Sequence, residues 1–220
     1  MRFKNREDAG KKLAEKLANL KALSPVVLAI PRGGVVVGDI IANALNAKLD
    51  LVVPRKIGAP YNPELAIGAV MHDGTCYLNR DIIAALNISE NYIKREIEFQ
   101  KMEIERRLQL YRKTKDYDLR DKNIVLVDDG IATGATMLVV INWLKKQQPK
   151  KLVVAVPVLP AETLEILKRE VDEVIYVLAP YEFEAVGEFY EDFSQVEDEE
   201  VIKIMKSHIG KGHKQITITK

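Results

Sequence analysis

The stretch Lys122-Asn-Ile-Val-Leu-Val-Asp-Asp-Gly-Ile-Ala-Thr-Gly-Ala-Thr136 decides the fold of this 220-residue chain. Its four aliphatic residues, 124–127, show no polar alternation, which is typical of a strand buried on both faces of a sheet. Asp128 and Asp129 follow this strand, and a loop of small residues then leads into an apolar helical pattern at 135–146. A strand, a loop and a helix in this order form the repeating unit of an α/β fold.

The loop in this stretch has the composition of an anion-binding site. Free backbone N–H groups at the start of a helix bind anions, and the hydroxyls of Thr133 and Thr136 would add donors. Gly134 would let a phosphate approach the backbone closely. Two acids beside a phosphate would repel it, so Asp128 and Asp129 predict a ligand that also presents hydroxyl groups or a bound Mg²⁺.

Apolar runs alternate with helical patterns through most of the remaining chain. The further strands are predicted at 26–30, 49–53, 152–156 and 174–178. The further helices are predicted at 6–21, 35–45 and 161–169. This alternation predicts an α/β protein with a parallel, five-stranded sheet flanked by helices, in which ligand sites lie at the carboxyl ends of the strands.

One region departs from this alternation. Residues 66–71 and 75–78 are β-like and flank His72-Asp73-Gly74, and Asp-Gly between such segments predicts an antiparallel hairpin that would form a flap. The charged helix predicted at 89–112 carries one apolar stripe, and its charged face is interpreted as solvated. We expect a single domain over residues 1–210, followed by a loosely attached tail at 211–220.

Composition excludes several classes of protein. The chain has 33 basic and 32 acidic residues, and a formal net charge of +1 gives no field that would attract nucleic acid or a membrane surface. No apolar run approaches the roughly 18 residues that span a bilayer, so we expect a cytoplasmic protein without a membrane partner. Cys76 is the only cysteine and the three histidines are scattered, which excludes an intrachain disulfide and argues against a metal cage made by the protein alone.

An acidic pair at a strand end is not specific by itself. It also occurs in Walker B motifs and in phosphoacceptor sites, and it can be a coincidence in an α/β scaffold. The sequence has no G-x-x-x-x-G-K-[ST] segment, which argues against a P-loop nucleotidase. It also has no G-x-G-x-x-G after a strand, the usual signature of dinucleotide binding.

Residues 124–136 as a whole resemble the thirteen-residue phosphoribosyl pyrophosphate (PRPP) motif of type I phosphoribosyltransferases. The resemblance implies that Asp128 and Asp129 hold the ribose hydroxyls. It also implies that the 5′-phosphate is wrapped by a loop made of Ala132, Thr133, Gly134, Ala135 and Thr136. Gly130 departs from the motif, which usually has an aliphatic residue at this position.

Two further segments resemble the same family. Arg32-Gly33-Gly34, after the first predicted strand, is similar to its pyrophosphate loop, where glycines expose backbone donors and an arginine neutralises the leaving group. Arg55 and Lys56 begin a segment similar to its flexible catalytic loop, with loop and hairpin together covering about 54–78. Ordinary surface charge is the alternative interpretation of these two cations. Over its whole length the chain looks most like an uncharacterised group of predicted phosphoribosyltransferases.

The resemblance implies a reaction. The 5-phosphoribosyl group of PRPP would pass to a nitrogen nucleophile, a nucleobase-like acceptor, with release of pyrophosphate and with Mg²⁺ carried by PRPP near Asp128 and Asp129. Tyr181 and Phe183 are the candidates for stacking on the acceptor, from a hood expected at about 180–195, and packing of this hood is the alternative. Ala132 stands where 6-oxopurine enzymes carry an acid, which disfavours hypoxanthine and guanine.

A second class of function stays open. The chain could be a non-catalytic regulator that binds PRPP, although retention of Arg32, Arg55 and Lys56 favours an enzyme because a sensor needs no clamp for a leaving group. The near-neutral charge predicts no nucleic-acid partner. The habit of the family, together with the apolar stripe at 89–112, suggests a homodimer.

Overall fold

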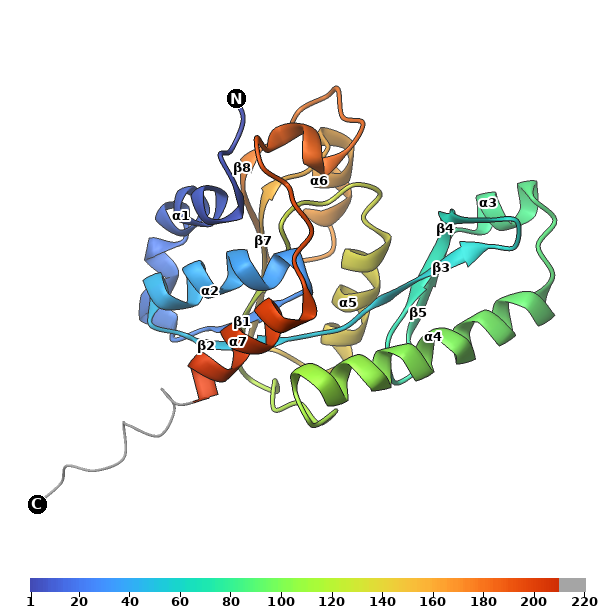
Figure 1. The fold of residues 1–220 in the computed structure, drawn as a ribbon, viewed down its shortest axis with the longest axis horizontal. Helices are drawn as coiled ribbons and strands as arrows, with labels where there is room; N and C mark the ends of the chain where they lie inside the picture. Colours follow the sequence, from blue (N-terminus) through green and yellow to red (C-terminus); the bar gives the residue numbers. More distant parts are fainter. Residues whose placement is uncertain (210–220) are drawn as a thin grey trace, which may run out of the picture. The chain divides into compact units, whose positions relative to one another are not determined.

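The computed structural model describes residues 1–209, and these form two compact units. The first contains residues 1–51, 121–132 and the chain from 149 onward, and the second contains residues 52–120 and 133–148. The tail predicted at 211–220 lies outside the described residues. Each unit has its own sheet, and the two are described separately below (Figure 1).

The first unit is built on a parallel sheet of five strands in the order β2-β1-β6-β7-β8. The strands are β1 (Val26–Ala29), β2 (Lys48–Leu51), β6 (Asn123–Val127), β7 (Lys151–Val158) and β8 (Glu173–Leu178). Val26 of β1 is aligned with Lys48 of β2 on one side and with Ile124 of β6 on the other. The predicted parallel sheet is therefore confirmed, and its central strands are buried because side chains on both faces are covered.

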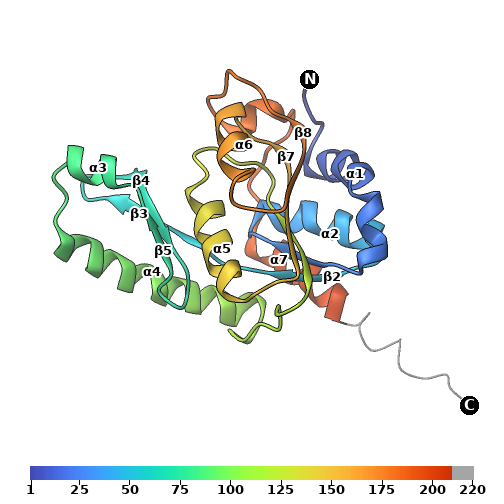
Figure 2. The same ribbon diagram turned by 180° about the vertical axis from the view of Figure 1, so that it is seen from behind.

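Helices of the first unit cover this sheet. They are α1 (Arg6–Lys16), α2 (Gly33–Leu45), α6 (Ala161–Leu167) and α7 (Asp198–Ile209), with 3₁₀ segments at Ala18–Leu23 and Val186–Phe189. Asn5 caps α1 by accepting a hydrogen bond from the backbone N–H of Asp8, and α1 and α2 lie side by side in both views (Figures 1 and 2). The predicted first helix ends at Lys16, and a 3₁₀ segment replaces its last turn. Helix α7 was not predicted.

The second unit contains an antiparallel sheet in the order β3-β4-β5, with helices α4 and α5 packed on it. Its elements are β3 (Arg55–Ala59), β4 (Asn62–Val70), β5 (Cys76–Leu78), α3 (Arg80–Ala85), α4 (Glu90–Tyr111) and α5 (Ala135–Lys146). The predicted hairpin joins β4 to β5 at Gly74, whose φ of 85° suits glycine. The Asp73 carboxylate stabilises this turn by accepting bonds of 2.8 Å from the backbone N–H and the hydroxyl of Thr75.

Strand β3 corrects one expectation. The segment after residue 54 was predicted as a flexible loop, but residues 55–59 are a strand aligned with β4. The reason is burial, since Ile57 is fully buried in the second unit, as is Ile67 of β4. Gly58 allows the two strands to approach closely, because a Cβ atom there would lie 2.7 Å from the carbonyl oxygen of Pro63.

The long helix α4 uses its apolar stripe inside the second unit. Ile93, Ile104, Leu108 and Tyr111 are buried, and α4 packs on β3 and β4. This stripe therefore gives no support to a homodimer, which stays a prediction. Within residues 1–209, no helix combines the length and the apolar character needed to cross a bilayer.

Candidate active site

The carboxyl end of β6 carries Asp128 and Asp129. Residues 124–127 are buried, so the chain leaves the core at Asp128, and both aspartates are half-buried. The backbone N–H of Asp129 donates a 2.9 Å hydrogen bond to Oδ1 of Asp128. This bond fixes the Asp128 carboxylate against the backbone of its neighbour.

Electrostatics makes Asp128 an unusual carboxyl group. Desolvation raises its pKa well above the ordinary value, and the neighbouring charge of Asp129 raises it further. Backbone hydrogen bonding and the charge of Arg6 act in the opposite direction but do not prevail. The ionised form of Asp128 is thus costly in the absence of a cation or a hydrogen-bonding ligand.

Asp129 is held by Arg6 of α1. The Nε atom of Arg6 lies 2.7 Å from Oδ2 of Asp129, and the two side chains are 12% and 15% exposed. A terminal nitrogen of Arg6 also donates to the backbone oxygen of Ser194 at 2.7 Å, and its guanidinium lies 3.9 Å from the centre of the Phe193 ring. Arg6 is therefore fixed by three groups and neutralises Asp129.

Tyr190 supports the backbone of the same aspartate. Its hydroxyl donates a 2.5 Å hydrogen bond to the backbone oxygen of Asp129, and the side chain is almost fully buried. Burial, followed by the charge of Asp129, raises the pKa of Tyr190, so the phenol stays a donor. The ring of Phe3 packs on it with centroids 5.2 Å apart.

The Arg32-Gly33-Gly34 segment begins α2 directly beside the two aspartates. A Cβ atom on Gly33 would lie 1.8 Å from Oδ2 of Asp129, and one on Gly34 would lie 2.9 Å from Cα of Asp128. No other residue could stand at either position without a shift of its neighbours. The structure therefore brings Gly33 and Gly34, which were predicted to bind the pyrophosphate, against Asp128 and Asp129, which were predicted to bind the ribose.

Arg32 does not point toward a free anion site in this state. One of its terminal nitrogens lies 3.5 Å from an Asp198 carboxylate oxygen and 3.7 Å from one of Glu197. Both acids stand at the start of α7, the helix that was not predicted. Arg32 is only partly exposed, so a pyrophosphate would have to compete with these two acids for it.

The loop after the aspartates is anchored to the sheet of the first unit. The backbone N–H of Ile131 donates to the carbonyl oxygen of Val158 at 3.0 Å, and the Thr163 hydroxyl donates to the carbonyl oxygen of Ala132 at 3.2 Å. A Cβ atom on Gly130 would lie 2.4 Å from the Val186 side chain. Val186 thus fills the space that an aliphatic residue at position 130 would need, which explains the departure from the motif.

The rest of the loop belongs to the second unit and begins α5. Gly134 has a φ of 78°, which favours glycine, and its carbonyl oxygen accepts the first helical bond from Leu138. No side chain caps α5, and the hydroxyls of Thr133 and Thr136 have no hydrogen-bond partner within residues 1–209. Ala135 is buried as the first residue of the helix. These free donors have the chemistry of an anion site.

Arg55 and Lys56 lie at the start of β3 in the second unit. The Nε atom of Arg55 donates a 2.8 Å hydrogen bond to Oε1 of Gln100, which is buried on α4. Lys56 is exposed, and no partner for it occurs in the described part of the chain. Arg55 is thus fixed by its own unit, whereas Lys56 is a surface cation that a ligand could recruit.

The hood aromatics divide into one exposed ring and several packed ones. Tyr181 is 96% exposed. Phe183 stacks on Phe189 with centroids 5.2 Å apart and packs against the cluster around Phe3 and Tyr190. Packing thus accounts for Phe183 in this state, and Tyr181 is the freer of the two.

Sequence reasoning missed the role of Arg6 and the hydrogen bond of Tyr190. Arg6 resembles any first-turn residue of an amphipathic helix, and no spacing relates it to position 129. Tyr190 lies in the segment 180–195 that was expected to form the hood, in which Tyr181 and Phe183 were the stacking candidates. Neither residue carries a sequence signal, because both contacts depend on how distant elements pack.

The carboxylates of this unit suit a magnesium ion that brings its own ligands. Within residues 1–209, no cluster of three or more histidine, cysteine or acidic side chains could hold a metal alone. Mg²⁺ is often bound through one or two carboxylates, several waters and the phosphates of a substrate. Asp128 and Asp129 fit that donor set, although Arg6 now pairs with Asp129.

Known proteins share the sequence and the fold of this chain. The family described as "Phosphoribosyl transferase domain" matches residues 2–187. Proteins named "Putative phosphoribosyl transferase" from two strains of Mycobacterium tuberculosis, MT0597 and Rv0571c, are 38% identical over 204 residues, which is 92% of this chain and 46% of theirs. The chain therefore spans about half the length of these curated relatives.

A solved structure is similar over almost its entire length. The crystal structure of TT1426 from Thermus thermophilus is 43% identical and has a TM-score of 0.77, with 94% of this chain and 99% of that chain covered. The shared fold therefore includes both the five-stranded sheet and the smaller antiparallel sheet.

Proposed function

Because the chain belongs to the phosphoribosyl transferase domain family, we propose that it is an Mg²⁺-dependent enzyme that transfers the 5-phosphoribosyl group of PRPP to a nitrogen nucleophile. A nitrogen of the acceptor forms a bond to C1 of the ribose while the bond from C1 to the pyrophosphate oxygen breaks. Pyrophosphate leaves with the bonding electrons, and the acceptor nitrogen loses its proton. The observation that carries this proposal is the contact of Gly33 and Gly34 with Asp129 and Asp128.

The acidic pair has the ribose as its ligand in this proposal. Two adjacent ribose hydroxyls can donate to carboxylate oxygens, and they replace the partners that Asp128 and Asp129 have in the free protein. Asp129 then gives up part of its bond to Arg6. Asp128 gains donors that favour its ionised form, which opposes the desolvation that raises its pKa.

Backbone groups and cations hold the two phosphate ends. Residues 132–136 supply free hydroxyls and the uncapped N–H groups of α5 for the 5′-phosphate. Gly33 and Gly34 offer backbone donors to the pyrophosphate, and Arg32 leaves its acidic partners to neutralise it. Arg55 and Lys56 are the further cations assigned to the pyrophosphate.

Mg²⁺ would be held by Asp128 and Asp129 together with oxygens of PRPP. When bound, the ion supplies positive charge to the ribose hydroxyls and to the departing pyrophosphate. The protein's own task is to keep both carboxylates at the end of β6, where Tyr190 and the Asp128 backbone bond fix them. This assignment is consistent with the lack of a three-ligand cluster in residues 1–209.

The acceptor is proposed to be a flat, nucleobase-like ring. Tyr181 is the better candidate to stack on it, because Phe183 already packs on Phe189. Ala132 has a methyl side chain and offers no carboxylate to a base, and its carbonyl oxygen accepts a hydrogen bond from the Thr163 hydroxyl. The lack of an acidic side chain at position 132 disfavours 6-oxopurines as acceptors.

A thermal-unfolding experiment with PRPP and Mg²⁺ tests the binding part of the proposal. A ligand at a hundred times its Kd stabilises the folded state by about 2.7 kcal/mol, and the double variant Asp128→Asn/Asp129→Asn should lose that gain. The control is Glu15→Gln/Glu199→Gln, which removes two exposed acids from the same unit. No stabilisation of the folded wild type would refute PRPP binding.

Turnover separates an enzyme from a PRPP-binding regulator. Release of pyrophosphate with any of a panel of nucleobases or amines supports the enzyme. Binding of PRPP without release for every acceptor would favour the regulator, in which the acids that hold Arg32 keep it from the pyrophosphate.

A further inference from the structure

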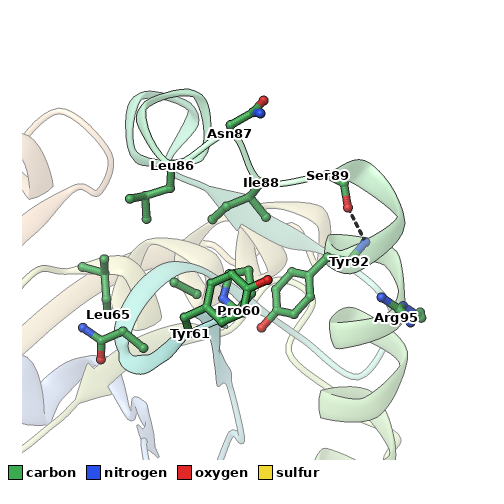
Figure 3. Close-up of a pocket in the computed structure, with 11 residues that line it drawn as sticks. Pro60, Tyr61, Leu65, Leu86, Asn87, Ile88, Ser89, Tyr92 and Arg95 are labelled. Carbon is green, nitrogen blue, oxygen red and sulfur yellow. Dashed lines mark hydrogen bonds between the residues drawn. The ribbon is translucent and has the colours of Figure 1, made fainter.

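The second unit has a pocket that the proposed reaction does not use. Its volume is about 500 Å³, and it lies between the turn that joins β3 to β4 and the connection from α3 to α4 (Figure 3). The residues that define its character are Tyr61, Leu65, Leu86, Ile88, Tyr92 and Arg95. All of them belong to the second unit, so the pocket is formed without any part of the first.

Large apolar side chains converge on this pocket although they are exposed. Tyr61 is fully exposed, Leu86 is 50% exposed and Leu65 is 37% exposed. In Figure 3, Leu86 and Ile88 extend from the connection between α3 and α4 toward the β3–β4 turn, which carries Tyr61. Single exposed apolar residues are common, but a concave group of them marks a binding site. The volume lies within the range of roughly 300 to 1,000 Å³ that is typical of small-molecule sites.

Tyr92 contributes a ring rather than a hydroxyl. Its hydroxyl donates a 2.9 Å hydrogen bond to the carbonyl oxygen of Gly58, which fastens β3 to α4 beside the pocket. Desolvation raises the pKa of Tyr92, and the phenol is therefore neutral. With Tyr61 and Pro60 at the hairpin turn, the pocket presents flat and apolar surfaces to an occupant.

Arg95 is the one charged residue among those that line the pocket, and it differs from the other basic residues of α4. Lys94, Lys101, Arg106 and Arg107 each lie beside a glutamate three or four positions away. Arg95 is exposed and has no ion pair or hydrogen bond with any residue from 1 to 209. The pocket thus combines aromatic and aliphatic walls with one unpaired positive charge.

We propose that this pocket binds a planar aromatic anion, a flat ring that carries a carboxylate or phosphate group. The ring occupies the apolar space between Tyr61 and Leu86, and the anionic group pairs with Arg95. Such a ligand would connect the β3–β4 turn to the start of α4. The site is independent of the PRPP motif and goes beyond the proposed transfer reaction.

A matched pair of probes tests this proposal by isothermal titration. 2-Naphthoate and 2-naphthamide share one ring system and differ in charge. The naphthoate should bind several-fold more tightly, because its carboxylate pairs with the exposed Arg95. Arg95→Gln should abolish this preference and Arg95→Lys should retain most of it. Tyr61→Ala should weaken both probes. Phenyl phosphate and benzoate then show which anionic group is preferred.

Control variants separate this site from the rest of the molecule. Arg80→Gln removes another exposed arginine of the second unit, Tyr181→Ala removes another exposed tyrosine, and neither should change naphthoate binding. Asp128→Asn/Asp129→Asn should also leave naphthoate binding unchanged. Loss of PRPP binding can therefore be distinguished from loss of naphthoate binding.

Three results would overturn the proposal. Equal affinity for the two probes would remove the role of charge. Unchanged affinity in both Arg95→Gln and Tyr61→Ala would place the probes elsewhere. Absence of binding, together with a dimer that Tyr61→Ala dissociates in sedimentation, would make this face an interface between copies of the chain.

Discussion

The Nε atom of Arg6 lies 2.7 Å from Oδ2 of Asp129, although 123 positions separate the two residues in sequence. This ion pair joins the first helix to the end of the central strand β6. It gives one of the two motif aspartates a cation in the free protein. The same carboxylate is the one that Gly33 leaves room for.

Loss of Arg6 should destabilise the protein more than loss of a surface cation. Arg6→Met keeps an unbranched apolar chain but removes the guanidinium that lies over Phe193, and it leaves Asp129 unpaired and poorly solvated. We expect the free energy of unfolding, measured in urea, to fall by about 2–3 kcal/mol. Lys12→Met on the same helix breaks a more exposed pair with Asp8 and should cost less than about 1 kcal/mol.

A double-mutant cycle identifies the origin of this loss. Arg6→Met combined with Asp129→Asn should regain much of the stability, because no unpaired charge remains. Strict additivity of the two single changes would show that the ion pair contributes nothing.

Gly33→Ala should destabilise the protein because the new methyl group clashes with Asp129, and removal of the Asp129 carboxylate should reduce this loss. The new Cβ atom would coincide with the Asp129 carboxylate, so α2 or Asp129 must move, at a cost of about 1–3 kcal/mol. In the background of Asp129→Ala the same substitution should cost clearly less, because the remaining close neighbour, Nε of Arg6 at 2.6 Å, is the end of a flexible side chain that has lost its partner. Urea unfolding of the four proteins measures both effects, and an equal cost in the two backgrounds would contradict the contact.

Asp128→Asn should stabilise the protein in a pH-dependent way. Because the pKa of Asp128 is higher in the folded than in the unfolded chain, the wild type loses stability as pH rises from the ordinary aspartate value through the raised pKa. The variant lacks this loss. The free energy of unfolding of the variant should equal that of the wild type near pH 4 and should exceed it by about 0.5–2 kcal/mol at pH 8. Such a gain is expected when a functional charge is removed.

Unfolding in urea between pH 4 and pH 8 provides the measurement. Glu15→Gln, which removes an exposed acid, serves as the control and should show no such trend. An Asp128→Asn protein that is less stable than wild type at pH 8 would contradict the predicted sign of the effect.

Glu103 should show the opposite dependence on pH. Hydrogen bonding to Arg106, together with Arg107, lowers the pKa of Glu103 to about 2 from an ordinary value of 4.5. The contribution of ionised Glu103 to the free energy of unfolding is therefore complete above pH 4.5 and is lost as pH falls through about 2. Glu103→Gln should cost about 1 kcal/mol at pH 7, because the network is near the surface, and clearly less near pH 2, where half of Glu103 is protonated in the folded state. A cost that is the same at both pH values would exclude the ion pairs as its cause.

Much of the fold could be predicted because buried parallel strands have a local signature. The runs at 26–30, 124–127 and 152–156 are continuously apolar, since both faces of each strand are covered, and each predicted strand is present. The β4–β5 hairpin was predictable from Asp73-Gly74, where the turn requires a positive φ. Strand β3 was missed because Gly58 and Pro60 are typical of a loop, whereas burial of Ile57 is decided by its partner strand.

The sequence by itself determined the alternation of strands and helices, the placement of Asp128 and Asp129 at a strand end, and the loop of small residues that leads to α5. These features follow from periodicity and local backbone preference, which act over a few residues. The tertiary structure decided that Arg6 neutralises Asp129, that α7 supplies partners to Arg32, and that Tyr61 and Arg95 share one pocket. These contacts join positions far apart in sequence, so they depend on how helices and strands pack and have no local signature.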